Sequence, residues 1–515
     1  MTTGPAHTPA AAITLNGTPA RPGLASPPGP AERALVAALP VPDKVQLLTG
    51  AASWRTHGCP DLGLRPMIMS DGPAGVRGVT KDERQPSTSL PCPSAWGATW
   101  DTGLVAELAT ALGAEARGKG VDVLLAPTIN LMRTPLGGRG FECFAEDPVL
   151  TARIAVAFIT GLQSAGVAAT AKHFVGNDSE TGRWTYDAVI SEPVLRELYL
   201  APFEACVREA GTALVMAAYN MVNGTPATAH AWLLRRILKG EWDFDGVVVS
   251  DWNAARTTVP TAVAGLDLAM PGPKGPWGPD LVQAVLDGVV PEADIDDKVI
   301  RILRLADRVG ALAGAHGQPA ADGQRPGALA GPGLVRRATA ASFVLLRNER
   351  QVLPFDAATI GSIALIGPNA VRPVIQGGGS AMVAPAAVAT PAAALPAALA
   401  HRGTVTVAEG CRTWTAVPEP APGSIRDPQT GEPGLRLEFR AGDGSLISSE
   451  HRGSTDLAWW DEGLPAGVGW DEDGTIVLRT RYRATSTGPH LAGAAGVGRL
   501  TLSADGALLA DEETA

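Results

Sequence analysis

The sequence predicts an α/β protein whose first large unit is a (β/α)8-type barrel. From Ala31 to about Leu312, short and nearly continuous apolar runs alternate with amphipathic helical patterns. Runs of this kind are typical of parallel strands that are covered by helices on both faces. The length of this span suits a barrel, which typically has about 250 residues. A doubly wound open sheet is the competing interpretation, and the lack of a GxGxxG motif after the first strand weakens it.

The elements of this unit can be placed in order along the chain. Strands are expected at residues 66–70, 121–126, 167–175, 212–219 and 246–250, each of them apolar. Helices are expected between them, with Asp101 capping the first and Ser191 opening a later one. The other helices are expected over residues 148–162 and 231–241 and, as two stretches, within 279–312.

The 515 residues are too many for one ordinary domain. Residues 1–30 are rich in Pro, Ala, Gly and Thr, which indicates a flexible tail, and the barrel is expected over 31–312. Residues 313–333, rich in Gly, Ala and Pro, resemble a linker. A second α/β unit follows, with a helix over 334–346 and strands at 360–366 and 404–408. From Leu435 onward, the alternation of apolar and polar residues becomes β-like.

Composition excludes several classes of partner and site. The net charge of −10 argues against nucleic acid and against anionic membranes as partners. No apolar run reaches the roughly 18 residues of a membrane span. The five cysteines are sparse and form no CxxC, so we expect neither a disulfide framework nor a zinc site, and no cofactor. Since the N-terminus has no cationic, apolar leader, a cytoplasmic location is expected.

Polar residues follow four of the predicted strands directly. They are Asp71, the pair Lys172 and His173, the pair Tyr219 and Asn220, and the pair Asp251 and Trp252. A single aspartate after a strand is more often a helix cap, but in a barrel the carboxyl ends of all strands meet at one mouth, where active sites are built. Four such positions together therefore predict a site.

The residue types at this mouth suit a polyhydroxylated ligand. Carboxylates and cations hydrogen-bond to hydroxyl groups, and an indole ring covers the apolar face of a sugar. Arg77 and Arg139 lie on loops after predicted strands and add two further cations. No Gly-rich phosphate-binding loop precedes a predicted helix, which argues against a phosphorylated ligand.

Several motifs together resemble a known family of enzymes. In order, SDGPAGVRG, LGGRGFECFAEDP, AKHFVGNDSETGR, AAYNMVNG and GVVVSDW are similar to glycoside hydrolase family 3, in its β-glucosidase branch. The later motifs SFVLLRNERQVLPF, IALIGPNA and QGGGSA resemble the start of that family's second domain, an α/β sandwich. The resemblance implies that residues 334–412 form the first part of this sandwich. It also implies that 413–515 form part of a β-sandwich insert of the protective-antigen type.

The resemblance also implies roles for individual residues. Asp251 corresponds to the nucleophile of a retaining β-glycosidase, which must be an ionised carboxylate beneath the anomeric carbon. Lys172 and Arg139 are expected to keep it ionised. The family's sugar-binding positions fall on Asp71, Arg77, Arg139, Lys172, His173, Met216, Tyr219, Trp252 and Ser380. Of these, Met216 could equally be an ordinary core methionine, and His173 has the weaker alternative of a buried core histidine.

Two departures from the family's pattern bear on which branch the chain resembles and on where its general acid/base lies. The N-acetylglucosaminidase branch carries a histidine in the loop after KHF, and here that loop, VGNDSETGR, has none. The β-glucosidase branch takes its general acid/base, a glutamate, from the second domain beyond the insert. Because this chain reaches Ala515 within the insert, the sequence is expected to be an amino-terminal part of a longer enzyme. Glu142, in the barrel motif, is expected to be structural.

Two alternative functions remain open from the sequence. A Schiff-base aldolase would use Lys172 as an amine of depressed pKa in an apolar setting. A non-catalytic carbohydrate-binding protein would keep the pocket but lack the acid. The expected partner in the leading case is a small carbohydrate or glycoside.

Overall fold

The computed structural model describes residues 29–315, 317, 331–399, 403–411, 417–421, 423–459, 463–469, 474–484 and 486–514. The flexible tail expected over residues 1–30 lies outside these ranges except for its last two residues. The linker expected over 313–333 also lies mostly outside them.

The first unit is built around a parallel sheet of five strands. The spatial order is β10-β7-β5-β4-β3, and every pairing is parallel. Consecutive parallel strands need a crossover, and helices supply it here, which confirms the predicted alternation. All five predicted strands are present: β3 (Met69–Asp71), β4 (Val123–Leu125), β5 (Ala168–Phe174), β7 (Leu214–Ala217) and β10 (Val247–Ser250).

Short segments close this sheet into a barrel. Leu268 forms a parallel bridge with Val249 of β10, and the next residue, Ala269, forms a parallel bridge with Thr49. Strand β1 (Gly50–Ala52) then pairs antiparallel with β2 (Arg55–Thr56), and Arg55 bridges Ile68 beside β3. The ring therefore runs from the last strand back to the first. One part of it, β1 to β3, is antiparallel rather than a regular β/α repeat.

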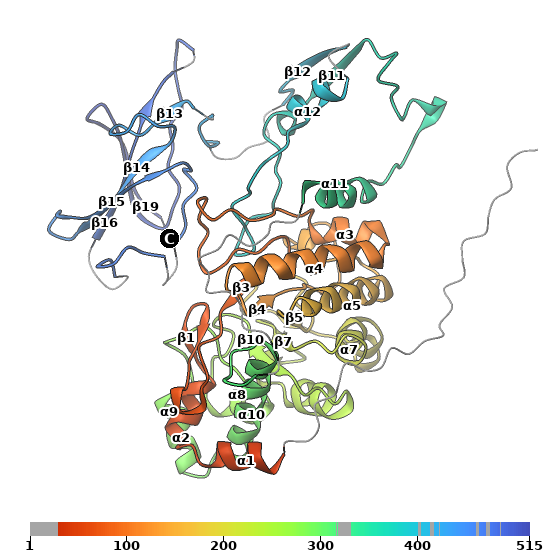
Figure 1. Ribbon diagram of the computed structural model, residues 1–515, viewed down its shortest axis with the longest axis vertical. Helices are drawn as coiled ribbons and strands as arrows, with labels where there is room; N and C mark the ends of the chain where they lie inside the picture. The colour runs from red at the N-terminus through yellow and green to blue at the C-terminus, as the bar shows by residue number, and fades with distance from the viewer. Residues whose placement is uncertain are drawn as a thin grey trace, which may run out of the picture.

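Helices cover the outside of the barrel, and Figure 1 shows α4, α5 and α7 along one side of it. The side chain of Asp101 accepts from the backbone N–H of Leu104, which confirms the predicted cap; Asp147 caps α5 in the same way. The helical segments are α1 (Pro30–Ala37), α2 (Val41–Leu47), α3 (Pro93–Thr99), α4 (Thr102–Gly118), α5 (Pro148–Ser164), α6 (Glu192–Val194), the π-helical η3 (Leu195–Tyr199), α7 (Ala201–Arg208), the π-helical η5 (Trp232–Glu241), α8 (Val259–Ala264), α9 (Pro279–Leu286) and α10 (Glu292–Arg308).

The second α/β unit is small and exposed. Strand β11 (Ser362–Ile366) pairs in parallel with β12 (Thr404–Ala408), and α12 (Pro391–Ala398) lies between them in sequence. Helix α11 (Pro332–Ala341) ends before the predicted limit of 346. The apolar run from Phe343 to Leu346 is extended and largely exposed. Four consecutive apolar residues are compatible with either a helix or an extended segment, so periodicity alone could not place the end of α11.

Strands are the only regular elements among the described residues of the last part of the chain, from 417 onward. A three-stranded antiparallel sheet has the order β15-β14-β16, and two two-stranded pairings, β13 with β17 and β18 with β19, accompany it. Leu435, Leu437 and Phe439 of β14 form a small core of their own. The strands are β13 (Ile425–Arg426), β14 (Leu435–Ala441), β15 (Leu446–Arg452), β16 (Gly474–Arg479), β17 (Arg481–Tyr482), β18 (Gly498–Ala504) and β19 (Ala507–Thr514).

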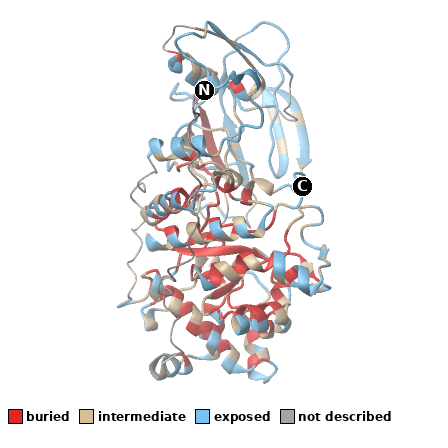
Figure 2. Ribbon diagram, turned by 90° about the vertical axis from the view of Figure 1, so that its right-hand side faces the viewer, coloured by how far each residue is buried: buried red, intermediate tan, exposed pale blue. Residues whose placement is uncertain are grey.

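Buried residues are concentrated in the barrel, whereas the second unit and the β-rich part are mostly exposed (Figure 2). The polar residues that matter below are therefore held by a rigid, well-packed element. Sites on such elements keep their geometry better than sites on free loops.

Candidate active site

Asp71 and Lys172 form a buried ion pair at the mouth of the barrel. Asp71 is the last residue of β3 and Lys172 lies on β5. The Nζ of Lys172 lies 3.1 Å from Oδ1 of Asp71, and both residues are at most 5% exposed. Burial alone would raise the pKa of Asp71, but Lys172, Arg77 and a hydrogen bond from Ser380 outweigh it, so the pKa lies below the ordinary value. Asp71 is therefore an ionised hydrogen-bond acceptor.

Ser380 reaches this pair from the second unit. Its hydroxyl group hydrogen-bonds to the carboxylate of Asp71, and its backbone oxygen accepts from Nη1 of Arg77 at 3.1 Å. Two backbone hydrogen bonds between Ser87 and the segment 384–386 join the barrel loop to the second unit nearby. The second unit thus contributes directly to the barrel mouth, as the resemblance implied.

His173 is held by Asn130 on one side and faces the site on the other. Oδ1 of Asn130 accepts from the backbone N–H of His173 at 2.8 Å and lies 3.0 Å from Nδ1, while Nδ2 of Asn130 donates to the His173 carbonyl oxygen. These bonds fix the orientation of the carboxamide and place the ring proton on Nδ1. Burial, Arg139 and Lys172 hold the pKa of His173 well below its usual value, so Nε2 presents a lone pair.

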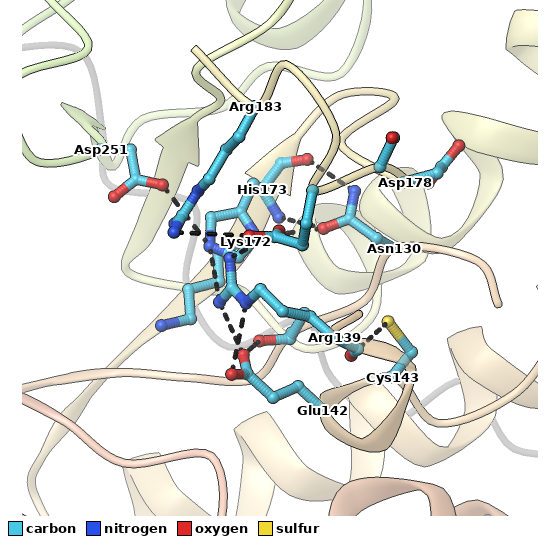
Figure 3. Close-up of polar contacts among 12 residues, drawn as sticks. Asn130, Arg139, Glu142, Cys143, Lys172, His173, Asp178, Arg183 and Asp251 are labelled. Atoms are coloured by element: carbon cyan, nitrogen blue, oxygen red, sulfur yellow. Dashed lines mark hydrogen bonds and ion pairs between the residues drawn. The ribbon is translucent and has the colours of Figure 1, made fainter. Parts of the chain in front are cut away.

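Arg139 lies between His173 and Glu142, as Figure 3 shows. Its Nη2 donates to Oε2 of Glu142 at 2.6 Å and lies 3.5 Å from Nε2 of His173. Burial would lower the pKa of Arg139, but Glu142, Asp251 and Glu180 raise it above the ordinary arginine value. Glu142 is thus committed to holding the guanidinium group, in agreement with its expected structural role.

Asp251 follows β10 and lies opposite His173 (Figure 3). Its Oδ1 accepts from the backbone N–H of Trp252 at 2.8 Å, while Oδ2 is buried, lies 3.6 Å from Nε2 of His173 and has no hydrogen-bond partner among the described residues. Since His173 is neutral, this contact is not an ion pair. Burial raises the pKa of Asp251 above the ordinary value, and Lys172 and Arg139 oppose that rise without cancelling it. The two cations expected to keep Asp251 ionised do act in that direction, but burial outweighs them.

Tyr219 lies against the same carboxylate. Burial and then the negative charge of Asp251 raise the pKa of Tyr219, so the phenol stays protonated and can donate. Trp184 packs against the Tyr219 ring at 4.4 Å between centroids, and the guanidinium group of Arg183 lies 4.6 Å from the centre of that ring. Arg183 and Trp184 lie on the loop after β5.

Trp252 is part of an aromatic stack. Its ring lies 5.0 Å from that of Trp54, with an interplanar angle of 27°, and the guanidinium group of Arg77 covers the Trp54 ring at 3.9 Å. The indole N–H of Trp252 donates to the backbone oxygen of Ser53 at 2.8 Å. The stack fixes the plane of Trp252 beside Asp251.

The structure therefore brings most of the predicted residues together. Contacts link Asp71, Lys172, Arg77 and Ser380 in one group, and Arg139, His173, Asp251 and Tyr219 in the other. Lys172 acts on both Asp71 and Asp251. Met216 differs, since it is 1% exposed and belongs to the barrel core, level with Lys172 in the register of β5 and β7.

Sequence reasoning missed four contributors: Trp54, Asn130, Arg183 and Trp184. Asn130 lies four residues beyond the predicted strand 121–126 rather than directly after it, and Trp54 lies on a turn between two very short strands. Arg183 ends the GNDSETGR segment, where a charged residue on a loop carries no signal of its own. Only their position in space identifies them.

The site offers no constellation for a metal ion. No group of three or more His, Cys, Asp and Glu side chains in the described ranges is arranged to hold one. Within the same residues, no helix is both long enough and apolar enough to cross a bilayer. The Schiff-base alternative is disfavoured, because Lys172 is bound to Asp71 rather than placed in an apolar setting.

Comparison with known proteins settles the family. The model of the glycosyl hydrolase family 3 N-terminal domain matches residues 46–305, and that of the family's C-terminal domain matches 343–492. The chain belongs to glycosyl hydrolase family 3. The second match extends through strands β13 to β17 of the β-rich part and ends before β18 and β19.

Two curated relatives and one solved structure illustrate the similarity. A β-glucosidase of Rhizobium radiobacter is 39% identical over 475 residues, and β-glucosidase B of Emericella nidulans is 37% identical over 484 residues. These alignments cover 91% and 92% of this chain but 56% and 55% of the relatives. The crystal structure of a Kluyveromyces marxianus β-glucosidase in complex with glucose superposes with a TM-score of 0.74 at 31% identity, over 82% of this chain and 52% of that one. This family member thus spans about half the length of those proteins.

Proposed function

We propose that this chain carries the sugar-binding and nucleophilic half of a retaining β-glucosidase, which hydrolyses terminal, non-reducing β-D-glucosyl or related β-glycosyl residues. The observation that carries the proposal is the carboxylate of Asp251, with one oxygen fixed by Trp252 and the other facing the mouth. This arrangement supports attack on an anomeric carbon. The naming of the relatives as β-glucosidases, and of one solved relative as a complex with glucose, supports a glucose-type sugar.

Each group has a role in the proposed reaction. Asp71, an ionised acceptor, would receive hydrogen bonds from two sugar hydroxyls, while Lys172 and Arg139 would donate to others. Nε2 of His173 would accept from a hydroxyl, since it carries no proton. Trp252 would cover the apolar face of the ring. Oδ2 of Asp251 would form the bond to the anomeric carbon as the bond to the leaving oxygen breaks.

The proposed reaction also needs a general acid. Besides Asp251, the carboxylates near Arg139 are those of Glu142 and Glu180, and arginines engage both: Glu142 through Arg139, and Glu180 through Arg139 at 3.9 Å and Arg183 at 3.5 Å. Both glutamates are thus already paired with arginines. We therefore assign the acid to a residue outside this group.

Leaving-group dependence tests the proposal with the chain as it is. General acid catalysis contributes roughly 10²- to 10⁴-fold, and most for poor leaving groups. The chain is expected to cleave an aryl β-glucoside of an acidic phenol slowly, and cellobiose barely. Added azide should accelerate turnover and yield the β-glucosyl azide with net retention. Efficient hydrolysis of cellobiose would show that an acid lies within this chain. An α-configured azide would refute the glycosyl-enzyme.

A further inference from the structure

Trp54 is a buried residue that lies outside all of the family motifs named above. It lies on the turn between β1 and β2, where the barrel changes from parallel to antiparallel pairing. Its side chain is 3% exposed. Its ring is in contact with two residues that have a proposed role in binding, Arg77 and Trp252.

The three side chains form a layered stack. The guanidinium carbon of Arg77 lies 3.9 Å from the centre of the Trp54 ring, within the range of a cation–π contact. The Trp252 ring lies 5.0 Å away and is inclined by only 27°. Offset stacking at this separation is favourable beyond the area that it buries. Trp54 therefore contacts both side chains and links an arginine to an indole.

Backbone contacts hold the turn against both ends of the barrel sheet. The carbonyl oxygen of Trp54 accepts from the N–H of Met69, two residues before Asp71. The carbonyl oxygen of Ser53 accepts from the indole N–H of Trp252. The turn thus bridges the first strand, which carries Asp71, and the segment after the last strand, which carries Asp251.

We infer that Trp54 is a positioning residue that presents Arg77 and Trp252 together to the sugar. Beyond Trp54, each layer continues to a group of the site: Arg77 donates to Ser380, and the backbone N–H of Trp252 donates to Asp251. The stack therefore runs from the second unit to the proposed nucleophile. The expected effect of Trp54 on sugar binding rests on the proposed function. The contacts of Trp54 with Arg77 and Trp252 do not.

A spectroscopic measurement tests the geometry without any sugar. Two stacked indoles couple their transitions and give a bisignate band in circular dichroism. The spectrum of the wild-type chain minus that of Trp54→Phe should contain this band, and the difference for Trp252→Phe should contain the same band. Trp96→Phe serves as the control, because Trp96 is buried in α3 and packs against Phe158 instead. No shared band in the first two differences would overturn the inference.

A binding measurement tests the consequence. Inactivation by 2-deoxy-2-fluoro-β-glucosyl fluoride needs no general acid and gives a saturation constant, KI, and a limiting rate. Trp54→Leu removes both ring contacts and should raise KI about tenfold, whereas Trp54→Phe should raise it less, with smaller effects on the limiting rate. An unchanged KI in a folded Trp54→Leu chain would refute the positioning role. If that variant does not fold, Trp54→Phe decides: an unchanged KI contradicts the inference and a rise supports it.

The outcomes separate this inference from the proposed function. If the wild-type chain is not inactivated at all, the proposed function is wrong, while the dichroism result still decides the stack. If the wild-type chain is inactivated and Trp54→Phe behaves like Trp96→Phe in both measurements, the proposed function stands and the role of Trp54 falls.

Discussion

Nζ of Lys172 donates to Oδ1 of Asp71 over 3.1 Å inside the barrel mouth, and neither side chain has more than a few per cent of its surface exposed. The two residues come from β5 and β3, which are separated in the sheet by β4. A buried pair of this kind fixes the distance between two strands and keeps Asp71 ionised. It is the basis of the first prediction.

Lys172→Met should destabilise the chain by about 3–5 kcal/mol at neutral pH, because it leaves the Asp71 carboxylate buried without its cation. The double variant Asp71→Asn/Lys172→Met should recover part of that loss. Since the pKa of Asp71 is lowered in the folded state, its contribution is present above the unfolded pKa and is lost as pH falls through the folded one. Urea unfolding as a function of pH measures both effects. Simple additivity of the two single variants would contradict the pairing.

A second prediction concerns how the rate of inactivation by 2-deoxy-2-fluoro-β-glucosyl fluoride depends on pH in the acidic range. Burial raises the pKa of Asp251, so the limiting rate of inactivation by the fluoroglucoside should begin to fall at a pH above 3.8, the ordinary aspartate value. Arg139→Met removes a cation that opposes this rise, and should move the acid limb to still higher pH. Arg153→Met, which alters an exposed pair with Glu209, is the control and should leave the profile in place. A shift to lower pH in Arg139→Met would be inconsistent with the assignment.

A third prediction concerns the protonation of His173. Nitrogen NMR of a histidine-labelled chain should show it neutral, with the proton on Nδ1, across about pH 5 to 8, where an ordinary histidine titrates. The cause is its burial next to Arg139 and Lys172, together with the fixed Asn130 acceptor. Asn130→Ala should remove the preference for the Nδ1 tautomer. An imidazolium signal assigned to His173 at pH 6 would show that its contact with Asp251 is an ion pair after all.

The β-rich part is joined to the barrel by charged contacts, which give a fourth prediction. Nε of Arg452 donates to Oε1 of Glu83 at 2.8 Å, and the backbone N–H of Gly453 donates to the same carboxylate. Arg84 pairs with Glu450, and Lys81 with Asp456. Arg452 is 3% exposed, so this contact is screened less by salt than a surface pair.

Glu83→Arg should therefore speed hydrogen exchange of the amides in the barrel loop 79–85, and Arg452→Glu should do the same. The exchanged pair, Glu83→Arg with Arg452→Glu, should restore protection at least in part. Arg499→Glu breaks an exposed pair with Asp511 within the last hairpin and should leave loop 79–85 unchanged. Equal exchange in all four variants would show that these ion pairs do not hold the loop.

The strand ends of the barrel could be predicted from sequence because each has a local signal. Each of these strands is an apolar run that ends in polar residues: Asp71, the pair Lys172 and His173, or Asp251. The structure places all of these polar residues at the barrel mouth. Packing against a helix is what makes such runs apolar on both faces, so the pattern and the fold have one cause.

Other features depend on contacts between distant segments. Trp54 and Trp252 are 198 positions apart in the chain, and no local sequence pattern predicts that their rings stack. The net pKa direction of Asp251 follows from a balance between burial and two cations, which needs coordinates. The β-like alternation from Leu435 onward predicts strands in general, but β15 and β19 are rich in polar and charged residues, so their own bounds have little apolar signal.

The account rests most on Asp251 as the nucleophile. The most direct test is to inactivate the chain with 2-deoxy-2-fluoro-β-glucosyl fluoride and map the modified peptide by mass spectrometry. The account predicts one fluoroglucosyl group per chain, on Asp251, with none on Asp251→Asn. A label on Asp71, Glu142 or any other residue, with Asp251 unmodified, would contradict it.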